Sequence, residues 1–392
     1  MIDYSSLLSG KVQEIKPSGI RKFSELAAEM GNVISLGVGE PDFQTPWVIR
    51  QAGIESLERG RTHYSPNAGF RELKQEIDRY LERRMGLSYS EEETMVTIGG
   101  SEAIDMMIRA VIDPGDEVLI PEPCYVSYDP IARLTGAKVV SIPTRFEDDF
   151  RLTAEALKAA ITPKSKLLIF PYPNNPTGGI MEREDLEAIA EVLRDTNILV
   201  LSDEIYAELT YGGKKHVSIA SIDGMRERTI VVNGFSKTYA MTGWRLGYAV
   251  GPAPLIREMI KIHQFAIMCA PTTSQYAAVD AMKNGDQDVE AMRESYNQRR
   301  RYLLHAFEEM NISCFEPQGA FYTFPNIKRF GMSSDEFATR LLKEEKVAVV
   351  PGTAFGDCGE GFLRISYAYS LESLKKALGR IKRFVDRLDG KA

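Results

Sequence analysis

Closely spaced cysteines and histidines, the usual marks of metal and redox sites, are missing from the sequence. Its 392 residues include only four histidines and four cysteines, and the cysteines stand far apart at positions 124, 269, 314 and 358. Zinc and redox motifs need such residues in close pairs or at regular spacing. We therefore expect no metal site, and we expect reduced cysteines that pack as small apolar side chains.

A basic stripe and a long apolar run are also missing. The 55 acidic and 48 basic residues are interspersed and leave a formal net charge of -7. Binding of DNA or RNA is not expected, because it needs clustered positive charge. No apolar run approaches the roughly 20 residues that cross a bilayer, and residues 1–15 contain no sustained apolar core. These absences predict a cytoplasmic protein that binds neither nucleic acid nor membrane.

The length of the chain and its alternating pattern predict two domains that share a cleft. A chain of 392 residues, 44% of them hydrophobic, is long for one domain. Strand and helix patterns alternate up to about residue 202, which is typical of a mostly parallel α/β sheet covered by helices on both faces. We predict an N-terminal arm and part of the small domain at 1–45, a large domain at 46–285 and an α+β small domain at 286–392. A long helical pattern at about 255–284 is expected to return the chain to the small domain.

The functional prediction depends most on the run TIVVNGFSKTYAMTGWRLGYAV, residues 229–250. One apolar strand ends early in this run and a second is expected from Trp244, so the residues between them form a tight loop. Lys237 in the loop can condense with an aldehyde as a Schiff base, while Ser236 and Arg245 suit a phosphate dianion. The alternative is a surface lysine in a solvated turn. An aldehyde that carries a phosphate describes pyridoxal 5'-phosphate (PLP).

A glycine turn predicts the opposite wall of the phosphate site. Residues 94–98 have the pattern of a strand and residues 103–112 that of a helix, with Gly100, Ser101 and Glu102 between them. A helix start gathers free N–H groups and the positive end of the helix dipole. We expect these three residues to bind phosphate mostly through their backbone.

Two further residues, Tyr125 and Asn175, follow the carboxyl ends of expected strands, where ligands of α/β proteins bind. Tyr125 follows the strand at about 117–120 and could stack on a flat ring or belong to the core. Asn175, in PYPNNPTGG, could face the cleft or form an ordinary turn. Arg364 lies inside an apolar strand, so it needs an anion, either a substrate carboxylate or a structural ion-pair partner.

Asp203 ends the fully apolar strand of ILVLSDEIY. A buried carboxylate without a partner is costly, so Asp203 needs a cation, and a pyridinium N–H would serve. That contact would keep the ring electron-poor. Tyr206, three residues on, could reach the phenolic oxygen of the same ring. The alternatives are a helix N-cap for Asp203 and a core aromatic for Tyr206.

Residues 234–247 resemble the PLP-attachment motif of class I and II aminotransferases, and the likeness covers essentially the whole chain. It implies a fold type I PLP-dependent transferase in which Lys237 is both covalent anchor and general base. By the same resemblance, Tyr125 stacks on the pyridine ring, Asn175 holds its phenolic oxygen and Arg364 clamps the substrate α-carboxylate.

The resemblance also gives roles to two residues of irregular loops. Gly39 would offer its backbone N–H to the substrate carboxylate. Tyr64 would reach across a dimer interface to the PLP phosphate of the neighbouring subunit. The family therefore implies a homodimer with shared active sites.

Four motifs, SGIRKF, GFSKTYAMTGWRLG, GAFY and GEGFLRIS, are similar to those of aromatic, aspartate and N-acetyl-LL-diaminopimelate aminotransferases. The expected reaction moves an amino group from an L-amino acid, aromatic, aspartate or glutamate, to a 2-oxo acid such as 2-oxoglutarate. Ser101 stands where some aspartate-specific members carry a lysine, which puts strict aspartate specificity in doubt. An N-acetyl-LL-diaminopimelate aminotransferase, a PLP-dependent lyase and a non-catalytic regulator are the alternatives.

Overall fold

The computed structural model describes residues 2–17 and 19–391, so Ser18 of the SGIRKF motif lies outside the described residues. Its larger body is built on a sheet whose strand order is β2-β8-β7-β6-β5-β3-β4. The strands are β2 (Thr94–Thr97), β3 (Glu117–Glu122), β4 (Lys138–Pro143), β5 (Ser165–Phe170), β6 (Leu199–Asp203), β7 (Thr229–Gly234) and β8 (Gly247–Val250). Only β8 runs antiparallel to its neighbours, as in the predicted mostly parallel α/β sheet.

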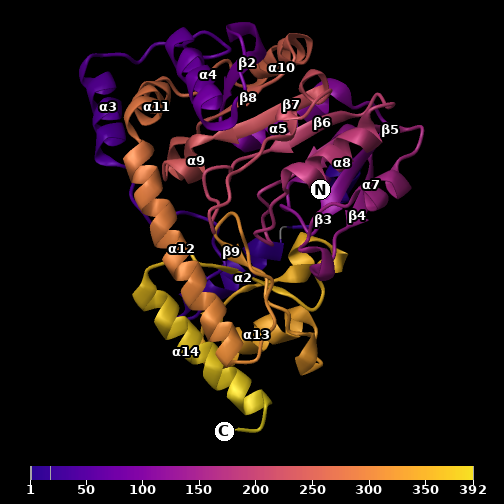
Figure 1. The fold of residues 1–392 in the computed structure, drawn as a ribbon, viewed down its shortest axis with the longest axis vertical. Coiled ribbons are helices and arrows are strands. Elements are labelled where there is room, and N and C mark those ends of the chain that lie inside the picture. Colours follow the sequence, from indigo (N-terminus) through magenta and orange to yellow (C-terminus); the bar gives the residue numbers. More distant parts are fainter. Residues whose placement is uncertain (1, 18, 392) are drawn as a thin grey trace.

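Both faces of this sheet are buried because its central strands are apolar on both sides. In β5, Leu167 and Ile169 belong to one apolar cluster, while Leu168 and Phe170 belong to another on the opposite face. The covering helices are α3 (Trp47–Glu58), α4 (Arg71–Met85), α5 (Gly100–Val111), α6 (Tyr128–Thr135), α7 (Ala154–Ala160), α8 (Arg183–Leu193), α9 (Phe235–Thr238), α10 (Ala253–Ala266) and α11 (Thr272–Asn284). This arrangement confirms the predicted fold class (Figure 1).

A smaller body lies below the sheet in Figure 1. Its strands β1 (Ile34–Ser35) and β10 (Val347–Ala348) pair in parallel, and β11 (Val350–Pro351), β12 (Leu363–Ser366) and β9 (Tyr322–Thr323) form an antiparallel sheet. Its helices are α1 (Gly10–Gln13), α2 (Gly19–Glu29), α12 (Asp286–Glu309), α13 (Ser334–Glu345) and α14 (Leu371–Leu388). Phe23 and Leu36 share its apolar cluster with the C-terminal helices, so the two ends of the chain meet here. The predicted boundaries after residues 45 and 285 stay predictions.

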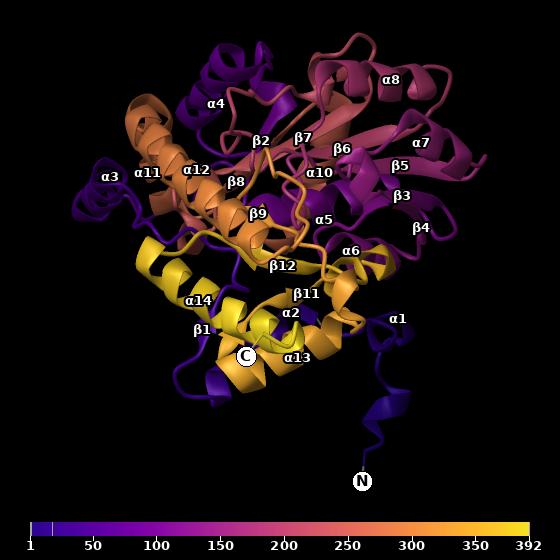
Figure 2. The same cartoon turned by 60° about the horizontal axis from the view of Figure 1, so that its bottom comes forward.

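Short 3-10 helices occur in both bodies and at the N-terminal end. They are η1 (Tyr4–Ser6), η2 (Glu91–Glu93), η3 (Phe146–Asp148), η4 (Ile219–Ser221), η5 (Arg226–Arg228), η6 (Thr242–Trp244), η7 (Lys328–Phe330), η8 (Gly352–Phe355) and η9 (Asp357–Gly359). In Figure 2 the residues before α1 extend away from the two bodies, while α1 itself contacts α6. No helix in residues 2–17 and 19–391 is long and apolar enough to cross a membrane.

The prediction of one long helix at about 255–284 is wrong. The structure has two helices there, α10 and α11, and both pack on the larger body, against α5 and against α3 and α4. Met268 between them has a φ of 77°, and Pro271 is the N-cap of α11. A left-handed residue ends a helix, and a proline cannot continue it. After α11 the chain returns to the smaller body through α12, the long orange helix of Figure 1.

Gly247, at the start of β8, is expected to tolerate no side chain. A Cβ there would lie 2.7 Å from the carbonyl carbon of Gly99 and 2.8 Å from the nitrogen of Gly100. Both are backbone atoms, so Gly247→Ala should push the start of α5 away from the sheet. We expect the free energy of unfolding to fall by about 1–3 kcal/mol, the usual cost of overpacking, with a lower Tm in a thermal scan.

Gly379→Ala is the matched control, because Gly379 is exposed on α14 and an added Cβ would have nothing within 4 Å. Alanine in an exposed helix should raise the free energy of unfolding by about 0.5–1 kcal/mol. The two substitutions should therefore shift Tm in opposite directions. A rise in Tm with Gly247→Ala would contradict the tight contact between β8 and α5.

Candidate active site

A cavity of about 280 Å³ lies between the two bodies and collects most of the residues predicted from the sequence. The predicted residues that line it are Gly39, Gly100, Ser101, Tyr125, Asn175, Asp203, Tyr206, Ser236, Lys237, Arg245 and Arg364. Two predicted residues, Glu102 and Tyr64, do not line it. Tyr128, to which the sequence assigned no role, lines it as well. So does Tyr322 of the GAFY motif, which from the sequence could suit an aromatic substrate side chain or belong to the core.

Lys237 reaches the cavity from α9, the short helix that follows β7. Its Nζ donates a hydrogen bond to the carbonyl oxygen of Gly39 at 2.6 Å. Removal from water lowers the pKa of Lys237 from 10.5 to about 8, and the nearby charges of Arg364 and Arg245 act in the same direction. Near pH 7 roughly a tenth of this amine is therefore uncharged, and that form can act as a nucleophile or a base.

Arg245 and the start of α5 form one end of the cavity. Arg245 follows η6 with a φ of 51°, so β8 begins at Gly247 and not at Trp244 as expected. A Cβ on Gly99 would lie 2.6 Å from Nη2 of Arg245, so the guanidinium lies close to the helix start. Free N–H groups, a helix dipole and a cationic fork together suit a phosphate dianion.

The carboxylate of Glu102 is held by other groups. Oε2 accepts the backbone N–H of Ile98 at 2.5 Å, and Oε1 lies 2.7 Å from Nδ1 of His263 on α10. Only the backbone of Glu102 remains available at the start of α5. Its predicted backbone role stays a prediction, and the contact with fully buried His263 had no signal in the sequence.

Asp203, at the carboxyl end of β6, is held by neutral donors. Oδ2 accepts the hydroxyl of Tyr128 at 2.7 Å, and Oδ1 accepts the backbone N–H of Ile205 at 3.2 Å. Burial raises the pKa of Asp203 from 3.8 to about 6. A cationic N–H on the open side of this carboxylate would oppose that rise and stabilise its charge. Sequence reasoning missed the contact between Asp203 and Tyr128, which lies three residues after Tyr125.

Arg364, on β12, has no carboxylate partner within the described part of the chain. It donates to Oδ1 of Asn175 at 3.0 Å and to the carbonyl oxygen of Gly37, while its buried Nε has no partner. The guanidinium also lies 4.6 Å from the ring centroid of Tyr322. The ion pair weighed from the sequence is absent among these residues, and the orphaned donor fits an incoming carboxylate.

Tyr206 and Tyr322 meet at the cavity wall, with their hydroxyl oxygens 2.8 Å apart. Both are buried, and burial raises the pKa of each hydroxyl, so both stay protonated. A Cβ on Gly39 would collide with the Tyr322 hydroxyl, so only glycine fits at that position. One of the two hydroxyls can donate outside this pair, toward an oxygen in the cavity.

Tyr64 lies outside the cavity on an irregular loop, and its side chain is 80% exposed. Among residues 2–17 and 19–391, no hydrogen-bond partner of its hydroxyl is found. Its predicted contact with a neighbouring subunit stays a prediction.

Residues 31–381 match the family model described as aminotransferase class I and II. The chain is 53% identical to the putative aminotransferase YugH of Bacillus subtilis, over 98% of this chain and 99% of that protein. It is 45% identical to an aspartate aminotransferase of Pyrococcus abyssi, over 96% and 97%. A solved aromatic aminotransferase from Pyrococcus horikoshii superposes with a TM-score of 0.89 and 44% identity, over 94% of this chain and 99% of that chain. The chain therefore belongs to the class I and II aminotransferase family of PLP-dependent enzymes.

Proposed function

We propose that the cavity binds PLP and that the enzyme moves an amino group from an L-amino acid, aromatic or acidic, to a 2-oxo acid such as 2-oxoglutarate. The observation that carries this proposal is the charge in the cavity. The lining contains three cationic groups, on Lys237, Arg245 and Arg364, and one carboxylate, on Asp203. A phosphate dianion and a substrate α-carboxylate together balance this set.

The residues present fit the cofactor at both of its ends. Arg245, Ser236 and the start of α5 would hold the phosphate, and Asp203 would bind the ring nitrogen. Tyr125 would stack on the ring face. When bound, PLP supplies an electron-poor ring that stabilises negative charge at a substrate carbon.

Lys237 has two tasks in this proposal. Its neutral Nζ would hold the cofactor aldehyde covalently, which its pKa of about 8 favours. Once a substrate amine had taken that place, the freed Nζ would be the base that removes the proton from the substrate Cα. Arg364 and Asn175 would hold the α-carboxylate so that the Cα–H bond faces this nitrogen.

The same cavity supports an aromatic donor. Tyr322 lines it, and its ring would suit an aromatic substrate side chain. Ser101, at the start of α5, has no charge for a second carboxylate. N-acetyl-LL-diaminopimelate is the second candidate, since a probable aminotransferase for it from Bacillus subtilis is 44% identical to this chain.

We also propose a homodimer. Exposed apolar side chains lie on the N-terminal residues, on α3 and at the end of α10, where Phe265 is 87% exposed. In water such surface is unfavourable unless another chain covers it. Tyr64, with its free hydroxyl, would then reach the phosphate site of the second copy.

Adding amino donors one at a time to the PLP-loaded enzyme tests the reaction. We expect Tyr, Phe, Asp or Glu to remove the visible absorbance band of the bound cofactor, and 2-oxoglutarate to restore it. Release of ammonia with a 2-oxo acid while the band persists would instead mean elimination.

Lys237→Ala should lose at least about 10⁴-fold in turnover, because it removes both anchor and base. Lys261→Ala, an exposed lysine paired with Glu258, is the control and should keep full activity.

The lowered pKa of Lys237 predicts how cofactor capture depends on pH. Only the neutral amine reacts, so the rate at which cofactor-free enzyme captures PLP should rise about tenfold per pH unit below the pKa. It should level off above about pH 8, where the amine is already neutral. Stopped-flow absorbance measures this rate. A midpoint near 10.5, the ordinary value for lysine, would show that the amine is not desolvated as described.

Shared sites predict recovery of activity in mixed dimers. Tyr64→Ala should bind PLP more weakly, and Lys237→Ala should be inactive. After unfolding and refolding as a mixture, a dimer of one chain of each has one site with both native residues. We expect activity at low PLP to exceed that of either variant alone. No recovery, with dimers confirmed by analytical ultracentrifugation, would refute the sharing of Tyr64.

A further inference from the structure

The segment that carries Tyr206 has no regular secondary structure. After β6 ends at Asp203, residues 205–208 form turns, held by backbone hydrogen bonds from Ala207 to Glu204 and from Leu209 to Tyr206. Backbone pairing fixes the segment at its two ends, where Glu204 bonds to Val232 and Thr210 forms a bridge with Gly319. Between those ends, contacts of neighbouring side chains contribute to the position of the Tyr206 hydroxyl.

Glu208 attaches this segment to α4 of the larger body, whereas Glu204, at the start of the segment, is bound separately by Ser202 and Ser218. Glu208 is only 9% exposed, and its carboxylate accepts Nε of Arg84 at 3.0 Å as well as Nη2 of the same residue. The buried hydroxyl of Tyr80 donates to the same carboxylate. A two-pronged guanidinium contact with a third donor fixes both the position and the orientation of a carboxylate.

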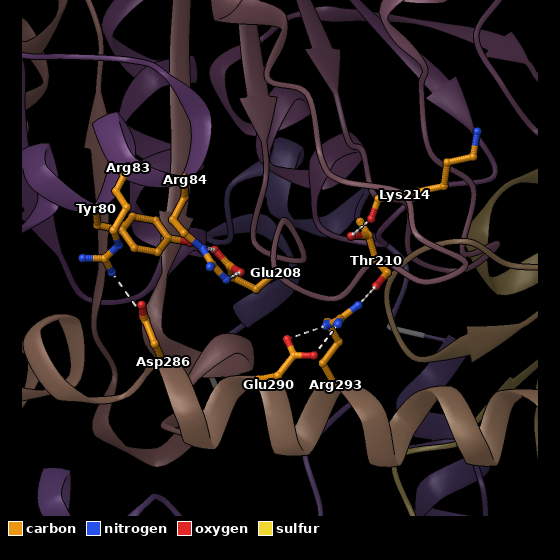
Figure 3. A network of polar contacts seen from close by, with 9 residues as sticks. All are labelled: Tyr80, Arg83, Arg84, Glu208, Thr210, Lys214, Asp286, Glu290 and Arg293. Carbon is orange, nitrogen blue, oxygen red and sulfur yellow. Dashed lines mark hydrogen bonds and ion pairs between the residues drawn. The ribbon is translucent and has the colours of Figure 1, made fainter.

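The two donors come from a rigid element. Tyr80 and Arg84 lie one turn apart on α4, a helix of 15 residues that ends at Gly86 in the left-handed conformation. Residues four apart on a helix face the same way, so both reach Glu208 together. Figure 3 shows this cluster beside α12.

Arg83, the neighbour of Arg84, makes a different connection. Its Nη2 lies 3.1 Å from Oδ1 of Asp286, at the start of α12. Both partners are about half exposed, so this pair should contribute little to stability. The adjacent residues Arg83 and Arg84 thus bind different carboxylates, so a substitution of Arg83 is a matched control for loss of the contact with Glu208 (Figure 3).

We propose that Glu208, held by Arg84 and Tyr80, is a positioning residue for Tyr206. By fixing the backbone two residues on, it keeps the Tyr206 hydroxyl against that of Tyr322 and directed at the phenolic oxygen of the cofactor. The inference rests on the proposed function, because only bound PLP gives the Tyr206 hydroxyl that target. Displacement of a catalytic group by about 1 Å can cost as much as 10²-fold in rate.

Glu208→Gln tests this role with little change of shape. A donor on the phenolic oxygen of PLP favours the deprotonated form of the Lys237–cofactor linkage, so loosening Tyr206 should raise the pH at which the bound cofactor changes colour. We expect an upward shift of about half a pH unit, in the direction of Tyr206→Phe but smaller, and a kcat about tenfold lower with little change in KM. Tyr80→Phe should shift the midpoint the same way. Arg83→Gln should leave the spectral midpoint unchanged and kcat within about twofold of that of the unaltered enzyme.

A double variant separates positioning from folding stability. Arg84→Met alone strands a buried carboxylate, so it is combined with Glu208→Leu, which removes both charges together. This pair should keep a Tm near that of the unaltered enzyme while the spectral midpoint stays shifted. A normal Tm with a normal midpoint would overturn the proposal, because Tyr206 would then keep its position without the ion pair.

The outcomes also separate this inference from the proposed function. If the unaltered enzyme shows the spectral titration and transaminates, while Glu208→Gln matches Arg83→Gln, the positioning role is refuted and the proposed function stands. If the unaltered enzyme binds no PLP at all, both are refuted.

Discussion

The charge of Arg364 is buried without a carboxylate beside it in the described residues, and much of the site can be understood from that fact. Its guanidinium is bonded only to neutral oxygens, and one buried N–H has no partner. Burial of such a group is costly, so the pKa of Arg364 is lowered and the charge needs an anion. Lys237 and Arg245 add to the excess, and Asp203 offsets only part of it. The cavity is complete only when it holds negatively charged ligands.

The fold explains how these charges come together. Asp203 and Lys237 follow the carboxyl ends of adjacent parallel strands, β6 and β7, which meet at one edge of the sheet. Asn175 follows the carboxyl end of β5, the next strand along, and the smaller body brings Arg364 on β12 against it. The bond between Arg364 and Asn175 therefore joins the two bodies at the site itself. Cofactor and substrate would both lie at this junction.

Parts of the site without regular structure depend on side-chain contacts for their position. Arg245 has a left-handed backbone, and the segment after Asp203 is a series of turns. Tyr206 is held through Tyr322 on one side, while Glu208 ties the same segment to α4 on the other. Loops of this kind carry functional groups in many enzymes because a rigid scaffold lies behind them. Here that scaffold includes α4, which contributes nothing to the cavity wall.

The sequence by itself indicated which charged groups the site would contain. Asp203 ends an apolar strand and Arg364 lies inside one, and the cost of burying a charge obliges each to meet a partner. The alternation of strands and helices likewise determined the mostly parallel sheet. The tertiary structure decided the remainder, because it concerns contacts between residues distant in the chain. Tyr128 reaches Asp203 across 75 positions and Tyr322 reaches Tyr206 across 116, and no local pattern specifies such pairs.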